Sequence, residues 1–366
     1  MKIITILGTR PEITKLSPLL PLLDKHFNHI LVHSGQHYDY NMDEIFFSDL
    51  HLRKPDYFLN VGSGSHASQT AQIMVKFEEI LLREKPDWVI VFADPNTPLA
   101  GALVASKLHI PLIHLEAGCR SFNKQMPEEI NRIICDHCAD LLIAPDEVAR
   151  KNLLQEGLPE ERIQVVGSTA IESSLRNVAY AQEKSTVLEQ CGLVKGKYIL
   201  ATLHRAENTD DIQVLQGLFD AFSEISKRFP IVFPIHPRTR KIMDDQGLQL
   251  SEKVKIIEPQ GYLDFLRLLD GCLFILSDSG GIQEEAAALN IPCLILRNET
   301  EWTYLVKAGK NLLVGSDKEN IVSAANLLLN DPSKLQQMKS VRLDLNSNVA
   351  EKIIEVIRQA SAVTAP

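Results

Sequence analysis

Short apolar runs alternate with helix-length amphipathic stretches along almost the whole chain, and this alternation most constrains the fold. Helical patterns such as Ile13–Leu23, Ala71–Arg83, Pro98–Lys107 and Val214–Arg228 separate the runs. Strands alternating with helices are typical of parallel sheets that carry helices on both faces. The chain is therefore predicted to be α/β, with strands at Ile3–Leu7, Ile30–His33, Trp88–Phe92, Pro111–Leu115, Leu141–Ala144, Ile163–Val166, Tyr198–Thr202, Ile231–Ile235, Val254–Ile257, Leu273–Ser277, Pro292–Leu296 and Asn311–Val314.

The alternation pauses at the polar stretch Asn177–Gly196 and then starts again. We interpret this pause as the hinge between two doubly wound, Rossmann-like domains that face each other across a cleft, and 366 residues allow a core for each. The predicted domains are residues 1–172 and 173–346, and residues 347–366 form a last helix that could return to the first domain. Ligand groups in such folds lie at the carboxyl ends of the strands.

Composition narrows the class of partner. The chain has 47 acidic and 38 basic side chains and a net charge of −9, which argues against nucleic acid or an anionic membrane. No apolar run approaches a membrane span, and Met1–Leu7 resembles a first strand rather than a secretory signal. Six cysteines without framework spacing predict reduced thiols in the cytoplasm. Since no His-Glu-x-x-His or comparable cluster occurs, no metal or other cofactor is implied.

The strand, turn and helix start between Leu273 and Ala287 have the features of a phosphate site. The turn is Ser-Asp-Ser-Gly-Gly, and a helix is predicted to follow from Gln283. Unpaired N–H groups and the positive end of a helix dipole then point to one spot. A carboxylate in the first helical turn suits the ribose of a nucleotide, although an ordinary turn without a ligand is the alternative. The expected contacts are Ser279, Gly280, Gly281 and Glu285.

Three acidic groups are expected to converge at one sheet edge of the first domain. Asp94 and Glu116 follow neighbouring strands, and Glu128 begins a helix after Pro127. Close carboxylates push each other's pKa values apart, so that one can be protonated while another is a base. Proton transfer at carbon followed by departure of an oxygen leaving group needs such a pair. The alternative for Asp94 is an N-cap of the next helix.

Cationic and aromatic side chains follow other strands. Arg10 could hold a diphosphate, and Lys15, one turn beyond Pro11, could reach the same region. His204 and Arg205 could neutralise a leaving diphosphate, whereas His236 could equally be a satisfied polar residue. The further expected substrate contacts are Arg132, Gln260, Tyr262 and Phe265, of which Tyr262 or Phe265 could flank a base.

Several motifs together closely resemble the bacterial non-hydrolysing UDP-N-acetylglucosamine 2-epimerases. The resemblance covers nearly the whole chain in order, and its motifs are Gly8–Glu12, His114–Gly118, Met126–Arg132, Thr202–Asn208 and Ser277–Ala286. It implies a glycosyltransferase-B-like pair of Rossmann domains, a homodimer, and inversion at C2 of a UDP-linked 2-acetamido sugar. In that family UDP is eliminated to leave a bound 2-acetamidoglucal, and UDP then adds back.

The resemblance also implies roles for individual residues. Asp94, Glu116 and Glu128 match the acid/base carboxylates of the family, and His204 matches its catalytic histidine. The residues that match those holding UDP are Arg10, Ser279, Gly280, Gly281 and Glu285. Gln36-His37 matches residues that bind a second, activating UDP-sugar in some members.

Other substrates and outcomes stay open. Arg120–Lys124 and Thr300–Trp302 look like the branch that acts on UDP-2,3-diacetamido-2,3-dideoxyglucuronate, whose extra carboxylate needs a cation. Arg120, Lys124 and Arg238 are candidates for that cation. A hydrolysing epimerase that releases UDP, and a glycosyltransferase on the same architecture, are further alternatives. UDP-N-acetylglucosamine is the first choice of substrate.

Overall fold

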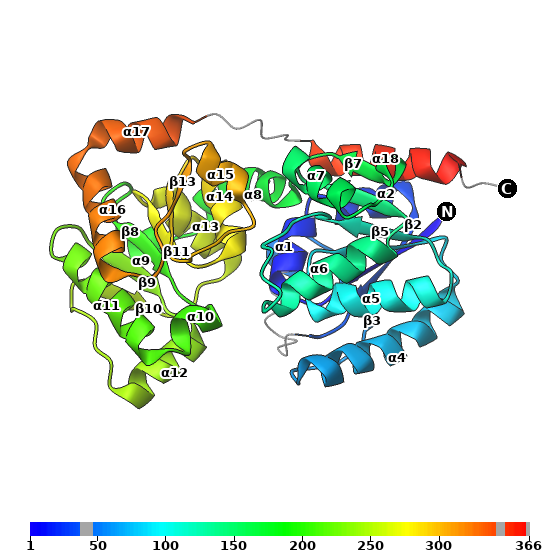
Figure 1. The fold of residues 1–366 in the computed structure, drawn as a ribbon, viewed down its shortest axis with the longest axis horizontal. Helices are drawn as coiled ribbons and strands as arrows, with labels where there is room; N and C mark the ends of the chain where they lie inside the picture. The colour runs from blue at the N-terminus through cyan, green and yellow to red at the C-terminus, as the bar shows by residue number, and fades with distance from the viewer. Residues whose placement is uncertain (37–46, 342–347, 364–366) are drawn as a thin grey trace. The chain divides into compact units, whose positions relative to one another are not determined.

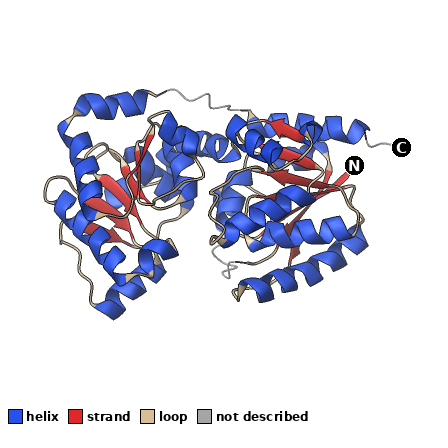
Figure 2. Ribbon diagram, in the orientation of Figure 1, coloured by secondary structure: helices blue, strands red, loops and turns tan. Residues whose placement is uncertain are grey.

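The computed structural model describes residues 1–36, 47–341 and 348–363, and it divides into two compact units. The first unit comprises Met1–Ser173 and Leu345–Pro366, and the second comprises Ser174–Asp344. Each unit contains one parallel sheet with helices on both faces (Figures 1 and 2). These sheets confirm the predicted fold class of two doubly wound α/β units.

The sheet of the first unit has the strand order β3-β2-β1-β4-β5-β6-β7, and every pairing is parallel. Apolar side chains are buried on both faces, with Ile4 and Val89 on one and Ile3 and Ile90 on the other, as expected of a sheet covered by helices on each side. The strands are β1 (Lys2–Leu7), β2 (Asn28–His33), β3 (Tyr57–Phe58), β4 (Trp88–Phe92), β5 (Leu112–Leu115), β6 (Leu141–Ala144) and β7 (Ile163–Val165). The helices are α1 (Arg10–Leu16), α2 (Leu20–His26), α4 (His66–Glu84), α5 (Asn96–Lys107), α6 (Pro127–Cys138), α7 (Glu147–Gln155) and α18 (Val349–Val363), with a 3₁₀ turn at Glu160–Arg162.

The sheet of the second unit has the order β10-β9-β8-β11-β12-β13, again parallel throughout. Two apolar clusters fill its opposite faces, one around Phe219, Phe222 and Phe233 and one around Tyr198 and Leu268. The strands are β8 (Ile199–Thr202), β9 (Ile231–Pro234), β10 (Val254–Ile257), β11 (Ile275–Ser277), β12 (Cys293–Ile295) and β13 (Asn311–Leu313). The helices are α9 (Val187–Gln190), α10 (Ala206–Thr209), α11 (Ile212–Ser226), α12 (Pro237–Gln246), α13 (Tyr262–Gly271), α14 (Gly280–Ala288), α15 (Thr303–Lys307), α16 (Lys318–Asn330) and α17 (Pro332–Ser340).

The polar stretch Asn177–Gly196, expected to be the hinge between the domains, is largely helical. Helix α8 (Thr169–Lys184) runs through the boundary between Ser173 and Ser174 and takes up the first part of that stretch. The polar residues belong to the exposed face of this helix, while Ala181 is fully buried. After it, α9 buries Val187 and Leu188 in the core of the second unit.

Two smaller features also differ from the sequence prediction. The helical pattern Ile13–Leu23 is two helices, because Pro18 has no N–H to continue the ladder and the chain turns before α2. The short strand β3 lies at the edge of its sheet and pairs only through Val32 and His33, so its two residues carry too little pattern to be recognised.

The last helix, α18, packs against α2 within the first unit, and Glu172 accepts the Ala350 N–H at 2.8 Å.

Candidate active site

Both sheets reverse their strand order at one place, and the expected site residues follow the strands there. The reversal lies between β1 and β4 in the first unit and between β8 and β11 in the second. In open α/β sheets the crevice outside the carboxyl ends of the strands at such a point is where ligands bind. Gly8 and Asp94 follow β1 and β4, and His204 and Asp278 follow β8 and β11.

Asp94 pairs with Arg132 of helix α6 and does not cap α5, the helix that follows it in the chain. Helix α5 begins at Asn96 after Pro95, with no side-chain cap, so the N-cap alternative for Asp94 does not hold. Its carboxylate accepts from Arg132 at 2.6 and 2.8 Å and remains partly exposed. The preceding Ala93 has a φ of 58°, a left-handed conformation that costs about 1–2 kcal/mol outside glycine. Strained backbone of this kind clusters at functional sites.

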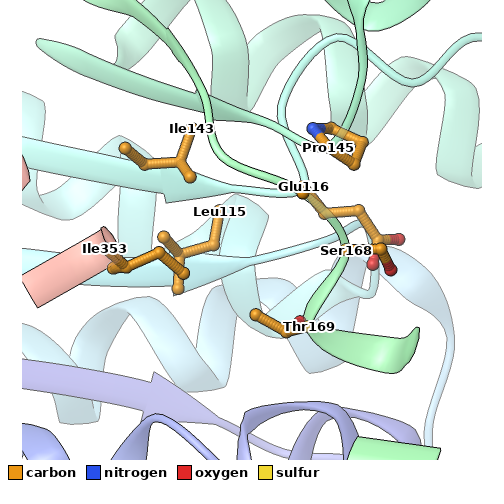
Figure 3. A pocket seen from close by; sticks show the side chains of 8 residues that line it. Leu115, Glu116, Ile143, Pro145, Ser168, Thr169 and Ile353 are labelled. Atoms are coloured by element: carbon orange, nitrogen blue, oxygen red, sulfur yellow. The ribbon is translucent and has the colours of Figure 1, made fainter. Parts of the chain in front are cut away.

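Glu116 follows the neighbouring strand β5 and also has left-handed backbone, with a φ of 66°. Its carboxylate accepts from Lys15 at 2.8 and 3.1 Å. The buried Lys15 ammonium thus lies on Glu116, and its expected contact with a diphosphate stays a prediction. Glu116 lines a small pocket with Ser168 and Thr169 (Figure 3). The buried Ser168 hydroxyl has no hydrogen-bond partner among the described residues.

Glu128, the third expected acid, lies half-buried in the first turn of α6. Its neighbour Glu129 is buried, accepts the N–H groups of Ser121 and Phe122, and pairs with Arg132 at 2.7 Å. Because Arg132 also binds Asp94, the start of α6 is held against the end of β4. The structure thus brings Asp94 and α6 together, and it assigns Arg132 a structural task in addition to the expected contact with substrate.

A further acid near this edge was not among the expected site residues. Glu12 is almost fully buried, and its Oε2 accepts the Gly8 N–H at 3.0 Å. Burial raises the pKa of Glu12 to about 8, an effect that hydrogen bonds from Thr9 and Gly8 only partly offset and that the Asp94 charge adds to. The carboxyl is therefore protonated at neutral pH. Its position in the turn Gly8–Glu12 was visible in the sequence, but its burial was not.

In the second unit His204 is paired with Asp278. The His204 Nδ1 lies 3.0 Å from Asp278 Oδ1, and Asp278 is fully buried whereas the imidazole is partly exposed. The same carboxylate accepts the N–H groups of His204 and Arg205. Burial acts to raise the pKa of Asp278, but the hydrogen bond and charge of His204 outweigh it and lower that pKa. An ionised carboxylate that orients an exposed imidazole is an arrangement suited to acid–base chemistry.

The expected phosphate turn is the start of α14. The helix begins at Gly280, not at Gln283, so Gly280 and Gly281 are its first residues and Ser279 is its N-cap. Ser279 makes no side-chain cap bond. A Cβ on Gly280 would lie 3.7 Å from the Arg205 guanidinium and 3.6 Å from the Glu301 carboxylate. Helix N–H groups and an arginine therefore meet at this spot, as anion binding requires.

The remaining expected contacts differ in their surroundings. His236 is the N-cap of α12, and its Nδ1 accepts the Arg238 N–H at 3.2 Å. This nitrogen is therefore satisfied within the protein, as the alternative to a substrate contact expected. Its ring centroid lies 6.2 Å from that of His204. Gln260 donates to the carbonyl of Glu258. Tyr262 is buried at the start of α13, Phe265 packs partly into the core, Arg10 begins α1 half-buried, and Glu285 lies half-buried on α14.

A buried ionic network behind the acids escaped the sequence reasoning. Asp136 binds His114 and Arg120, both at 2.6 Å, and accepts the Gly118 N–H. His114 also donates to the carbonyl of Ala93, the residue before Asp94. The Arg120 guanidinium, 1% exposed, is occupied by Asp136 and Glu156, so it is not available as the cation for a uronate. Spacing along α6 gave no signal for Asp136.

Two further expectations concern regulation and metals. The side-chain oxygen of Gln36 accepts from both the N–H and the hydroxyl of Thr97, at 3.0 and 2.7 Å, while His37 lies outside the described residues. Within the described ranges no group of three His, Cys, Asp or Glu residues is placed to hold a metal ion. No helix in that part of the chain is long and apolar enough to cross a membrane.

Comparison with known proteins agrees with the motifs. A sequence profile described as UDP-N-acetylglucosamine 2-epimerase matches residues 22–358. A protein of that name from Methanococcus maripaludis is 48% identical over 337 residues, which are 90% of this chain and 92% of the relative. A UDP-2,3-diacetamido-2,3-dideoxy-D-glucuronate 2-epimerase from Pseudomonas aeruginosa is 44% identical over 90% of this chain and 92% of its own length.

Solved structures give the same result. The crystal structure of Methanocaldococcus jannaschii UDP-GlcNAc 2-epimerase in complex with UDP-GlcNAc and UDP matches with a TM-score of 0.90 and 44% identity. The match covers 98% of this chain and 100% of that one. These findings confirm the resemblance, the glycosyltransferase-B-like class and the expectation of an enzyme that epimerises a UDP-sugar. The chain belongs to the UDP-N-acetylglucosamine 2-epimerase family.

Proposed function

We propose that this enzyme interconverts UDP-N-acetylglucosamine and UDP-N-acetylmannosamine by eliminating UDP and adding it back. A base removes the proton from C2, the bond between C1 and the diphosphate oxygen breaks with its electron pair, and a C1–C2 double bond forms. Return of a proton to the opposite face of C2 and of UDP to C1 completes inversion. The observation that carries the proposal is the placement of both groups of residues at strand-order reversals.

In this proposal the second unit, Ser174–Asp344, binds UDP. The first N–H groups of α14 and the nearby guanidinium of Arg205 suit the two phosphates. The imidazole of His204, oriented by the ionised Asp278, supplies positive charge or a proton as the diphosphate departs. Other contacts that we propose for UDP or its sugar are Arg10, Arg132, His236, Gln260, Tyr262, Phe265, Ser279, Gly280, Gly281 and Glu285.

The first unit supplies the groups that move the C2 proton. Asp94 follows the left-handed residue Ala93 at the end of β4, and Glu116 follows β5 with left-handed backbone of its own. Glu128 lies in the first turn of α6, which Arg132 holds beside Asp94. The Lys15 ammonium lies 2.8 Å from the Glu116 carboxylate and holds it in position. Two acids in different surroundings can serve as base and acid on opposite faces of one carbon.

The structure bears on the choice of sugar. A uronate needs a cation for its carboxylate, and two of the three candidates are occupied. Arg120 is buried between Asp136 and Glu156, and Arg238 pairs with Asp210. The sugar N-acetylglucosamine has no such carboxylate, so it remains our first choice, while the Pseudomonas aeruginosa relative keeps the diacetamido uronate as second.

The test is to incubate the purified enzyme with UDP-N-acetylglucosamine alone in heavy water and to identify the products by NMR. We expect both C2 epimers of the UDP-sugar, with deuterium at C2 of the product. Free N-acetylmannosamine together with UDP would show a hydrolysing enzyme instead. Epimers without deuterium would contradict the elimination route, and turnover of the diacetamido uronate with a kcat/KM more than about a hundredfold higher would reverse the choice of sugar.

We further propose that the enzyme is a homodimer that works in the cytoplasm. All six cysteines are free thiols in the structure, which suits a reducing compartment. Sedimentation equilibrium of the purified protein checks the oligomeric state, since a mass near 41.0 kDa would identify a monomer and exclude the dimer.

A further inference from the structure

Phe122 combines two properties that seldom occur together. It is the most exposed of the large apolar side chains in the described residues, at 72%, and its backbone is left-handed, with a φ of 62°. An aromatic residue at positive φ is a genuine outlier, because its Cβ crowds the following carbonyl group. Packing does not offset this strain, since the ring is mostly in solvent.

The other non-glycine residues with positive φ in the described part of the chain show how unusual Phe122 is. Away from this edge, the positions of this kind carry polar residues that end helices or form turns, namely His51, Asn60, Lys85, His109 and Asn290. The two others are Ala93 and Glu116, which flank or form the proposed acid groups. Phe122 is thus the one large apolar side chain among the described residues with left-handed backbone, and it shares this edge with Ala93 and Glu116.

Buried ionic contacts hold the Phe122 backbone in place. The Glu129 carboxylate, 1% exposed, accepts the Phe122 N–H at 2.8 Å and the Ser121 N–H at 3.0 Å. The same carboxylate pairs with Arg132 at 2.7 Å, and Arg132 binds Asp94 at 2.6 Å. A continuous chain of contacts therefore fixes the position of Phe122 relative to a proposed catalytic acid.

We propose that Phe122 contacts the sugar of the substrate, placing its ring against the apolar C–H face or acetamido methyl of the pyranose beside the acids. The inference rests on the proposed function and deepens it by naming a residue that recognises the sugar rather than UDP. Aromatic side chains bind ligands through large apolar area, and a ring over the sugar also keeps water from an unsaturated intermediate. Strain held by a buried network is expected where the displayed side chain has a task.

The test compares substitutions that separate the ring from the backbone strain. Phe122→Gly and Phe122→Asn adopt positive φ readily, so the Tm of each variant should be no lower than that of the wild type. We expect kcat/KM for UDP-N-acetylglucosamine to fall at least about tenfold in both, about 1.4 kcal/mol. The Kd for UDP alone should stay within about twofold of the wild-type value, and Phe122→Tyr, which keeps an aromatic ring, should retain activity. Val194→Ala, a change at another exposed apolar residue, is the matched control and should alter nothing.

The outcomes distinguish the inference from the proposed function. If the wild type makes no C2 epimer, the proposed function fails before Phe122 is tested. If the wild type is active and Phe122→Gly keeps kcat/KM within about twofold, the inference on the sugar contact is overturned. A shift of Phe122→Gly to a lower mass in sedimentation, absent from Val194→Ala, would also overturn it, because the ring would then belong to a contact between copies of the chain.

Discussion

Glu12 shows how burial of one side chain can couple stability to pH. Its pKa of about 8 lies well above the ordinary value of 4.5 for an exposed carboxyl. Between these two values the unfolded chain has released its proton while the folded protein retains it. The contribution of Glu12 to stability is therefore complete below about pH 4.5 and is lost as the pH rises towards 8, by about 1.4 kcal/mol per pH unit.

The prediction follows for Glu12→Gln, which keeps the shape and cannot ionise. Urea unfolding of both proteins at pH 5, 6, 7 and 8 should show that the variant gains stability over the wild type as the pH rises. Asp317→Asn, a change in an exposed helix cap whose carboxylate accepts the Asn320 N–H, serves as the control. Parallel pH profiles for wild type and Glu12→Gln would mean that Glu12 ionises normally.

The role of Asp278 in the site can be tested by replacing one of its carboxylate oxygens with an amide group. Asp278→Asn keeps the size of the side chain but removes the charge that orients His204. We expect kcat to fall about 10²-fold, the lower range for a lost proton-transfer group. Calorimetric titration should show that UDP binding changes much less. Near-normal kcat in a correctly folded variant would remove His204 and Asp278 from the mechanism.

At the scale of elements, the strand ends were predictable because a buried parallel strand is a short apolar run. Apolar runs indicated every strand of the described residues except β3, and polar residues after the runs indicated Asp94, Glu116 and His204. The partners that orient these groups come from distant helix positions, as Asp136 and Arg132 do. Helix boundaries were less predictable, because the polar face of α8 looks like a linker when its buried face is unknown.

The turn after β1 makes an element-scale prediction. A Cβ on Gly8 would lie 1.9 Å from the Ser34 hydroxyl and 2.4 Å from that of Thr97, so the end of β1 fits against α5 only without a side chain. Gly8→Ala should lower the free energy of unfolding by about 1–3 kcal/mol. Gly217→Ala is the matched change, because nothing lies within 4 Å of its Cβ position in α11.

Gly217→Ala should instead stabilise the protein by up to about 1 kcal/mol, since alanine favours the helix. Denaturant unfolding of the two variants against the wild type measures both effects. Equal effects of the two substitutions would contradict the close fit at Gly8. The comparison also tests the packing that places Arg10 and Glu12 at the sheet edge, because Gly8 is the first residue of their turn.

For the whole molecule, the sequence predicted two α/β units because the same alternation occurs twice, and each occurrence can close its own core. The path of the chain between units was harder to predict. Helix α18 comes from the end of the chain yet belongs to the first unit, where Val349, Ile353 and Ile357 are buried. Its pattern indicates an amphipathic helix, but an apolar face does not state which surface will cover it.

Because α18 belongs to the first unit, a destabilising substitution in α18 should lower the stability of that unit. Ile353 is 1% exposed and lines the pocket beside Glu116, so Ile353→Ala should destabilise the protein by about 2–5 kcal/mol and lower kcat. Because we assign UDP binding to the second unit, the Kd for UDP should change little. Glu355→Ala, at an exposed position of the same helix, is the control and should leave stability and turnover unchanged.

Calorimetry with and without UDP checks where the destabilisation falls. If the units unfold separately, Ile353→Ala should lower the midpoint temperature of the first unit's transition. Saturating UDP should raise the midpoint temperature of the second unit's transition, by an amount that follows from the UDP concentration and Kd. A variant that loses UDP affinity in proportion to its loss of stability would contradict this division of labour. UDP binding by the second unit and turnover by the acids of the first unit would then depend on one cooperative structure, and α18 would support both.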